Sequence, residues 1–192
     1  FSMAVQWVNR PNLDFRGFAG RIASGTVRQG DRIRVSPSGI ESQVKQIMSG
    51  DGAIEEAGFG ESISLVLETE VDISRGDVIG SATAPVEAAD QFEADLIWMS
   101  DLPLLPGRPY ALLMHAKSAT ATISDLKFKR DINSGSELAA RKLELNEIGV
   151  VNLSFDRLVP FRSYTENKRL GSFILIDKST NETVAAGMIH HA

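Results

Sequence analysis

Cysteine is absent from the 192 residues of this sequence. Its absence excludes disulfide bonds, thiolate nucleophiles and cysteine-ligated metal sites, and it fits a cytoplasmic protein. No apolar run approaches the roughly 20 residues that a membrane-spanning helix needs, and the first residues show no signal-peptide pattern. The pattern Gly-x-x-x-x-Gly-Lys-Ser/Thr is also missing, so the chain has neither that phosphate-binding loop nor its Mg²⁺-binding hydroxyl. We therefore expect no membrane partner and no nucleotide site of this type.

An excess of positive charge is missing as well. The formal net charge is −5 and the isoelectric point is about 5.3. This balance weighs against a surface built mainly to neutralise nucleic-acid phosphates, while leaving room for a local basic patch. The 43% of hydrophobic and 23% of charged residues are typical of a globular protein. At this length the chain can form one large domain or two small ones.

The sequence alternates between apolar and polar residues in short runs. Within residues 17–35, Phe18 and Ile22 fall on one face of a predicted strand, and Ile33 and Val35 fall on one face of the next. Glycines and aspartates that favour turns separate the runs. Further strands are predicted at residues 4–10, 42–47, 61–68, 78–79, 92–99, 110–116, 119–128, 150–155, 171–176 and 183–189. Many short strands separated by turns predict an all-β chain of barrels or sandwiches.

A small, polar segment with a proline in its middle, residues 81–91, predicts the boundary between two domains. We place the first domain at residues 1–88 and the second at residues 89–192. One segment of the second half is ambiguous. Residues 136–147 contain helix-forming residues, but Leu143 and Leu145 alternate as in a strand, so both structures stay open.

Turn glycines, aspartates and short aliphatic runs recur in the first half at Gly20, Arg21, Ile22, Gly25, Gly30, Asp31 and residues 44–47, 57–58, 60 and 72–78. This pattern resembles the second domain of translation-type GTPases such as elongation factor Tu. The glycines turn the chain, and the aliphatic residues fill a small barrel. The resemblance implies an all-β fold of two consecutive small β-barrels, like domains II and III of elongation factor Tu.

Longer sequence motifs indicate a more specific family. Residues 5–17, 101–108, 145–149, 167, 171–177, 180–181 and 186–189 carry the second resemblance. They are similar to the large, GTP-binding subunit of bacterial sulfate adenylyltransferase. The match covers nearly the whole chain, which we therefore expect to be a fragment that lacks the GTPase domain of its parent.

The resemblance implies a reaction for the parent enzyme. Members of that family make adenylyl sulfate and pyrophosphate from ATP and sulfate, coupled to GTP hydrolysis, in sulfate assimilation. Their adenylyl chemistry belongs to a separate small subunit, and GTP with Mg²⁺ binds an N-terminal domain. We therefore expect this region to be non-catalytic and inactive alone, with no catalytic, cofactor-binding or metal-binding residues. The implied partners are the small catalytic subunit, the parent's own GTPase domain and, in some bacteria, a fused adenylylsulfate kinase.

Two loops, residues 9–16 and 102–108, are predicted to contact partners. The candidate residues are Asn9, Arg10, Asn12, Asp14, Arg16, Leu104 and Arg108. The alternative interpretation is a barrel pair that binds tRNA or another nucleic acid, as the same domains do in elongation factors. The acidic charge balance weighs against this alternative.

Three short motifs favour structural interpretations. Residues 167–170 superficially match the guanine-reading Asn-Lys-x-Asp motif, but Leu170 stands where the aspartate belongs. His190 and His191 do not suggest a metal site, because adjacent strand residues face opposite ways, and we expect an exposed chain end there. Residues 127–130 interleave basic and aromatic side chains. We predict a strand with a buried Phe128 and solvated lysines.

Overall fold

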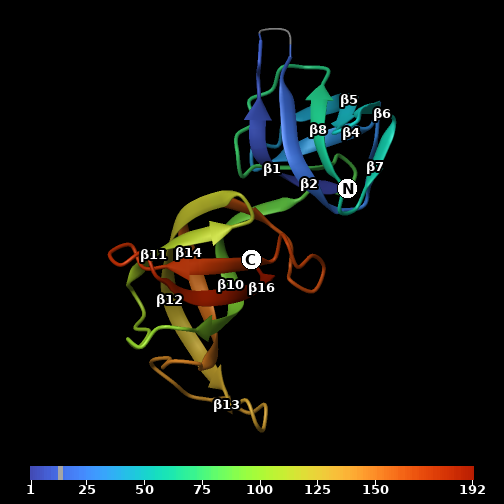
Figure 1. Ribbon diagram of the computed structural model, residues 1–192. Coiled ribbons are helices and arrows are strands. Elements are labelled where there is room, and N and C mark those ends of the chain that lie inside the picture. The colour runs from blue at the N-terminus through green and yellow to red at the C-terminus, as the bar shows by residue number, and fades with distance from the viewer. Residues whose placement is uncertain (13–14) are drawn as a thin grey trace. The chain divides into compact units, whose positions relative to one another are not determined.

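The computed structural model describes residues 1–12 and 15–192 (Figure 1). Every regular element in these residues is a β-strand, which confirms the predicted all-β class. The chain divides into two compact units, Phe1–Ala88 and Ala89–Ala192. The candidate residue Asp14 lies outside the described part of the chain. Within the described residues, no helix has the length and apolar character needed to cross a membrane.

The first unit is a closed barrel with a small additional sheet. Its strands are β1 (Ser2–Asn9), β2 (Gly17–Ser24), β3 (Thr26–Arg28), β4 (Arg32–Ser36), β5 (Glu41–Ser49), β6 (Gly52–Ile54), β7 (Glu56–Gly58), β8 (Ser62–Leu67) and β9 (Val78–Ser81). The hydrogen-bonded order β4-β9-β1-β2-β8-β5 closes on itself because β4 also pairs with β5. A six-stranded barrel results, with β6 added beside β5 and β3 paired with β7.

Alternation places the apolar side chains of these strands inside the barrel, as the sequence predicts. Phe18, Ile22 and Ile33 are all almost fully buried. Gly20 lets β1 approach β2 closely, because a Cβ at that position would collide with the Ala4 carbonyl oxygen and lie 2.9 Å from Met3 Cγ. The barrel interior is therefore filled by aliphatic and aromatic groups, and polar groups remain at its surface and ends.

The second unit has the same architecture with longer strands. Its strands are β10 (Glu87–Trp98), β11 (Pro109–Met114), β12 (Lys117–Arg130), β13 (Glu137–Leu138), β14 (Ile148–Phe161), β15 (Ser172–Ile176) and β16 (Thr183–His191). The order β11-β15-β16-β10-β14-β12 closes through pairing of β11 with β12, and β13 extends the sheet beyond β12. Trp98, Phe92 and Leu96 are among the largest fully buried side chains of its core.

The ambiguous segment of the second half is not helical. β13 covers only Glu137–Leu138, and the chain then runs through a loop to β14. Leu143 forms an isolated antiparallel bridge with Leu104, in which the Leu104 N–H donates to the Leu143 carbonyl at 2.8 Å. The Leu143 side chain is fully buried in the barrel core. Tertiary packing of this leucine therefore overrides the helix propensity of its neighbours.

Candidate partner-contact surfaces

The first predicted contact loop connects β1 to β2. Asn9 is the last residue of β1 and pairs with Gly17, the first residue of β2. Arg10 and Asn12 are exposed, whereas Arg16 is half-buried. The loop therefore begins and ends on a hydrogen-bonded strand pair, which places its described residues at one end of the first barrel.

Two ion pairs tie this loop to the segment between β8 and β9. Arg10 Nη2 lies 3.0 Å from Glu70 Oε1, and Arg16 Nη2 lies 3.6 Å from Asp72 Oδ1. The guanidinium of Arg16 also lies over the ring of Phe18, 5.4 Å from its centroid. Exposed ion pairs add little to stability. Here they hold Arg10 and Arg16, so these two residues lose less conformational entropy when a partner binds.

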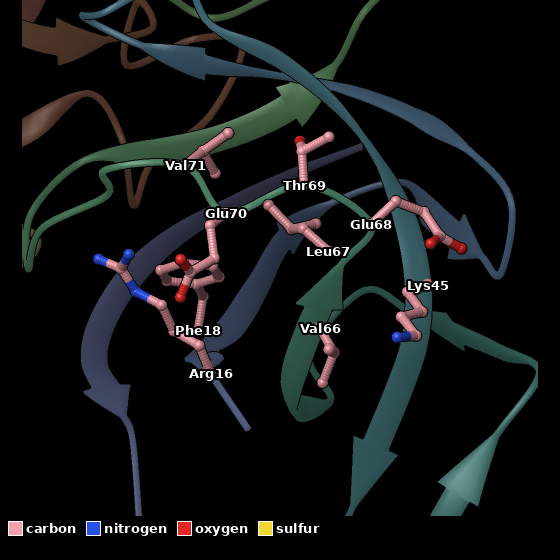
Figure 2. Close-up of a pocket in the computed structure, with 9 residues that line it drawn as sticks. All are labelled: Arg16, Phe18, Lys45, Val66, Leu67, Glu68, Thr69, Glu70 and Val71. Atoms are coloured by element: carbon pink, nitrogen blue, oxygen red, sulfur yellow. The ribbon is translucent and has the colours of Figure 1, made fainter. Parts of the chain in front are cut away.

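A small cavity of about 210 Å³ lies beside the loop (Figure 2). Figure 2 shows Arg16, Phe18 and Glu70 on one side of it and Lys45 and Glu68 on the other. The remaining lining residues are Val66, Leu67, Thr69 and Val71. The cavity combines two cations, two carboxylates and an aromatic ring. Such a set of groups can bind a polar side chain or small group, but the lining residues that the structure describes include no nucleophile paired with a base.

Trp7 is an exposed aromatic residue that the sequence pattern does not identify. Its exposure is 61%, although Met3 and Val5 of the same strand are buried. Strict alternation would place the Trp7 side chain inside the barrel as well. The β1–β2 pairing, however, shifts register between Val5 and Trp7. The extra residue of a bulge reverses the facing of the residues that follow it. A large aromatic side chain is thus presented next to the loop.

The second predicted contact loop, residues 102–108, is held at several points. The Trp98 indole N–H donates to the Leu102 carbonyl at 2.7 Å, and the Gly107 N–H donates to the Ile123 carbonyl at 2.9 Å. Arg108 forms an ion pair with Asp177. These bonds join the loop to strands β10 and β12 and to the β15–β16 turn, so its conformation is set by the barrel.

Arg108 has partners within its own barrel. Its guanidinium lies 5.8 Å from the centroid of the Tyr110 ring, beside the nearly buried carboxylate of Asp177. Hydrogen bonds from the backbone N–H groups of Ser179 and Thr180, together with Arg108, hold the pKa of Asp177 below its usual range. About half of the Arg108 side chain is exposed, so it can still reach a partner.

Leu104, one of the predicted contact residues of this loop, is buried rather than exposed. Its side chain has 0% exposure and belongs to the core of the second barrel. The bridge to Leu143 turns it inward, and loop sequence alone does not reveal that bridge. Leu102 and Leu105 are exposed instead, at 66% and 58%. These two leucines therefore replace Leu104 as the contact candidates of this loop.

Two further apolar side chains belong to the same end of the barrel. Met99 directly follows β10 and is exposed, as is Leu145. Because the Leu104–Leu143 bridge is antiparallel, Leu102 and Leu145, each two residues from it, lie on the same side of the bridge. We call Met99, Leu102, Leu105 and Leu145 the apolar end of the second barrel. Exposed apolar residues that gather in this way mark interaction sites more often than isolated ones do.

The basic segment of β12 differs from its prediction. Phe128 is only half-buried, and the lysines on either side of it, Lys127 exposed and Lys129 half-buried, are both paired with acids. Lys127 pairs with Glu93, and Lys129 Nζ lies 2.6 Å from Glu147 Oε1. The hydrogen bond with Glu147 raises the pKa of Lys129, and the same bond lowers the pKa of Glu147.

Arg130, the last cation of this segment, is also paired. Its Nε lies 3.4 Å from Asp95 Oδ1, and its guanidinium lies 5.4 Å from the centroid of the Phe128 ring. All three cations of residues 127–130 thus have acidic partners in the same barrel. Cations neutralised in this way are less available to phosphates. The segment therefore does not favour the nucleic-acid alternative.

The Asn167 motif is a structural turn. Its side-chain oxygen accepts hydrogen bonds from the backbone N–H groups of Arg169 and Leu170, at 3.0 and 3.1 Å. Leu170 is fully buried. The amide that would read a guanine base is therefore used to stabilise a loop, and these residues do not fit a guanine nucleotide.

Comparison with known proteins places the chain in a family. A family model described as GTP-eEF1A C-terminal domain-like matches residues 91–190. This match covers more than half of the chain, which belongs to that family. Two crystal structures of sup35, complexed with GDP and with GMPPNP, superpose with TM-scores of 0.89 and 0.87 at 20% and 18% identity. They cover 98% and 100% of this chain and 46% and 47% of the sup35 chains, and they confirm the predicted translation-factor fold.

Closer relatives carry more specific names. The chain is 47% identical over 192 residues to the bifunctional enzyme NodQ of Rhizobium sp. (strain N33) and 48% identical over 187 residues to the bifunctional enzyme CysN/CysC of Xylella fastidiosa. It is 44% identical over 185 residues to sulfate adenylyltransferase subunit 1 of Cronobacter sakazakii. These alignments cover 96–100% of this chain but 30–39% of the relatives' lengths. The predicted resemblance to sulfate adenylyltransferase large subunits is confirmed.

Proposed function

We propose that this chain is the non-catalytic two-barrel region of a GTP-dependent sulfate adenylyltransferase large subunit. The observation that carries the proposal is the identity of 43–48% to the named relatives over nearly the whole chain. The parent enzyme then makes adenylyl sulfate and pyrophosphate from ATP and sulfate, and this reaction is coupled to GTP hydrolysis. The absence of cysteine supports the further proposal that it works in the cytoplasm.

In this proposal the barrels connect a GTPase domain to the small catalytic subunit. Closed barrels suit this task because packed domains move as rigid bodies, and such shifts transmit a nucleotide state between sites. The β1–β2 loop and the apolar end of the second barrel are the surfaces that we assign to contacts. The loop is held by side-chain ion pairs and lies next to the exposed Trp7, and the apolar end is held by hydrogen bonds and exposes Leu102 and Leu105. Fixed loops with exposed anchors lose little entropy on binding.

Binding to the small subunit tests the contact surfaces. One variant replaces Leu102 and Leu105 with serine, and another replaces Trp7, Arg10 and Asn12 with serine. We expect each to weaken capture of the full chain by the immobilised small subunit about tenfold or more, since one lost anchor typically costs over 1 kcal/mol. The measurement is the dissociation constant from surface plasmon resonance or a titrated pull-down.

Matched controls come from exposed apolar residues elsewhere on the same barrels. Leu158 on β14 is 48% exposed and Phe59, between β7 and β8, is 68% exposed. Leu158→Ser and Phe59→Ser are expected to leave the dissociation constant unchanged. Undiminished binding after both contact surfaces have been replaced would remove the surface assignment, while leaving the proposed parentage to be tested separately.

The chain by itself is expected to bind GTP weakly, if at all, and to convert no ATP and sulfate. The physical reason is the missing phosphate-binding loop, without which the β- and γ-phosphates have no cradle of backbone N–H groups. Release of inorganic phosphate from GTP by the purified chain is the measurement. GTP hydrolysis that persists through purification and disappears on a point mutation of this chain would contradict the proposal.

A further inference from the structure

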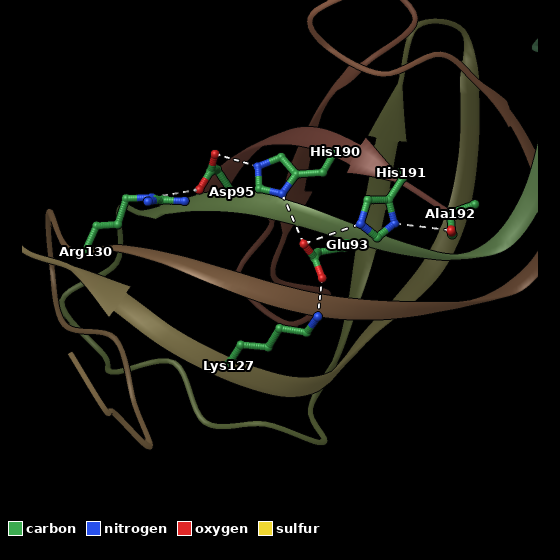
Figure 3. A network of polar contacts seen from close by, with 7 residues as sticks. All are labelled: Glu93, Asp95, Lys127, Arg130, His190, His191 and Ala192. Atoms are coloured by element: carbon green, nitrogen blue, oxygen red, sulfur yellow. Dashed lines mark hydrogen bonds and ion pairs between the residues drawn. The ribbon is translucent and has the colours of Figure 1, made fainter. Parts of the chain in front are cut away.

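A cluster of charged side chains joins three strands of the second barrel (Figure 3). Two carboxylates of β10 lie among cationic and imidazole groups of β12 and β16. We call this group the β10–β16 charge cluster. Its members are Glu93 and Asp95 from β10, Lys127 and Arg130 from β12, and His190 and His191 from β16.

Both histidines reach this cluster, although adjacent strand residues normally face opposite ways. The β10–β16 pairing joins Ala94 to Ile189 and Glu93 to His191, with a register shift between the two pairs. His190 is therefore the extra residue of a bulge, and a bulge directs neighbouring side chains toward the same face. The expectation of an exposed chain end is thus wrong for His190, whose side chain is 30% exposed and contacts two acids.

Both ring nitrogens of His190 contact a carboxylate. Its Nε2 lies 2.7 Å from Asp95 Oδ2, and its Nδ1 lies 3.3 Å from Glu93 Oε1. Ionised carboxylates only accept hydrogen bonds, and a neutral imidazole has a single N–H to donate. Two hydrogen bonds to ionised carboxylates need an N–H on both ring nitrogens, so this arrangement favours the imidazolium ion. A hydrogen bond from Lys127 is the main reason that the pKa of Glu93 lies below its usual range, so Glu93 is ionised at neutral pH.

Partial burial and hydrogen bonding act on His190 in opposite directions. Burial disfavours the imidazolium, but the hydrogen bonds with Asp95 and Glu93 outweigh this effect and raise the pKa above 6.5. The other charged members act on the same two acids. Lys127 and Arg130 approach Glu93 and Asp95 from β12. From β16, His191 Nε2 lies 3.6 Å from Glu93 Oε1.

We propose that His190, Glu93 and Asp95 form a proton-operated clasp that fastens the end of β16 to β10. With its proton, His190 binds both acids at once and bridges the two strands across the bulge. After deprotonation the ring keeps one N–H, and one of the two carboxylates then faces a nitrogen lone pair. The bridge is lost, and the last residues of β16 open more readily from the barrel. The clasp makes the local stability of the second barrel sensitive to pH near neutrality.

The sign of the pH dependence follows from the protonation states. The folded chain binds the His190 proton more tightly than the unfolded chain does. The clasp therefore contributes in full below pH 6.5 and is lost as the pH rises through the folded pKa of His190. Between pH 6.5 and the folded pKa, the closed state binds one proton that the open state does not. The equilibrium constant for local opening therefore rises by up to tenfold per pH unit.

NMR spectroscopy of the full 192-residue chain tests the proton itself. The ring resonances of His190 are followed from pH 5 to 9, and we expect a midpoint above 6.5 with the doubly protonated ring dominant below it. Asp95→Asn and Glu93→Gln each remove one charged acceptor and are expected to move the midpoint down. A midpoint at or below 6.5 in the unmodified chain, or one that neither variant lowers, would overturn the proposal.

Hydrogen exchange tests whether the proton fastens the strand. Amide exchange at the end of β16, corrected for its intrinsic pH dependence, is expected to accelerate through the window above pH 6.5 in the unmodified chain. His190→Gln should remove this acceleration, whereas the control Arg157→Gln, whose partner Asp156 lies outside the cluster, should retain it. Identical pH dependence in the unmodified chain and His190→Gln would overturn the clasp. If His190→Gln fails to fold, Glu93→Gln is compared in its place, with the same two outcomes.

Discussion

Replacing Leu104 with alanine is expected to lower the free energy of unfolding of the second barrel by about 2–5 kcal/mol. Leu104 is fully buried, and its backbone bridge to Leu143 holds it among the core side chains. Truncation removes buried methyl groups and leaves a cavity that the closed sheet cannot readily collapse. The cost combines the lost transfer free energy with the lost packing around the cavity.

Leu105→Ala is the matched control for this prediction. Leu105 follows directly in the same loop but is 58% exposed, so its truncation should change stability by no more than about 0.5 kcal/mol. Urea denaturation of both variants in a Trp7→Phe background, followed by the fluorescence of Trp98 and by circular dichroism, measures the difference. The assignment of Leu104 to the core fails if the two variants unfold at the same urea concentration.

Gly187→Ala is expected to cost about 1–3 kcal/mol or more, a large effect for the addition of one methyl group. Gly187 lies on β16 opposite Phe173 of β15, whose ring is 3% exposed and occupies the space beside the glycine. A Cβ built at position 187 would lie 2.5 Å from Phe173 Cε1, far inside van der Waals contact. The ring is surrounded by core side chains, so it cannot move away without repacking the barrel.

A double-mutant cycle isolates this collision. Phe173→Leu alone removes part of the ring volume and should be destabilising, but combined with Gly187→Ala it gives the new methyl group room. We expect the double variant to be more stable than the sum of the single changes by at least 0.5 kcal/mol, the usual coupling of residues in contact. Strict additivity in urea denaturation would show that the ring does not limit position 187. Gly50→Ala, where a Cβ would meet no atom within 4 Å, is the control for a glycine change without a collision.

The sequence by itself determined the class of the protein and the content of its strands. Alternation placed Phe18, Ile22, Ile33 and Val35 on inward faces, and all four are buried in the first barrel. Alternation of this kind is a local property, since successive side chains of any strand point to opposite faces. The long motifs of both halves were sufficient to identify the resemblance to sulfate adenylyltransferase large subunits. Such motifs consist of residues that are adjacent in the sequence, so they are recognised without a structure.

Tertiary structure decided the features on which the contact surfaces and the clasp depend. Trp7 is exposed and His190 joins His191 on one face because each strand contains a bulge, and a bulge is defined by its partner strand. Leu104 is buried because of a bridge to Leu143, and Lys127 is neutralised by Glu93. Each of these outcomes depends on residues that are distant in the chain and are brought together only when the barrels close. The local period of the sequence therefore predicts which faces are apolar, but not where a register shift or a long-range contact reverses that pattern.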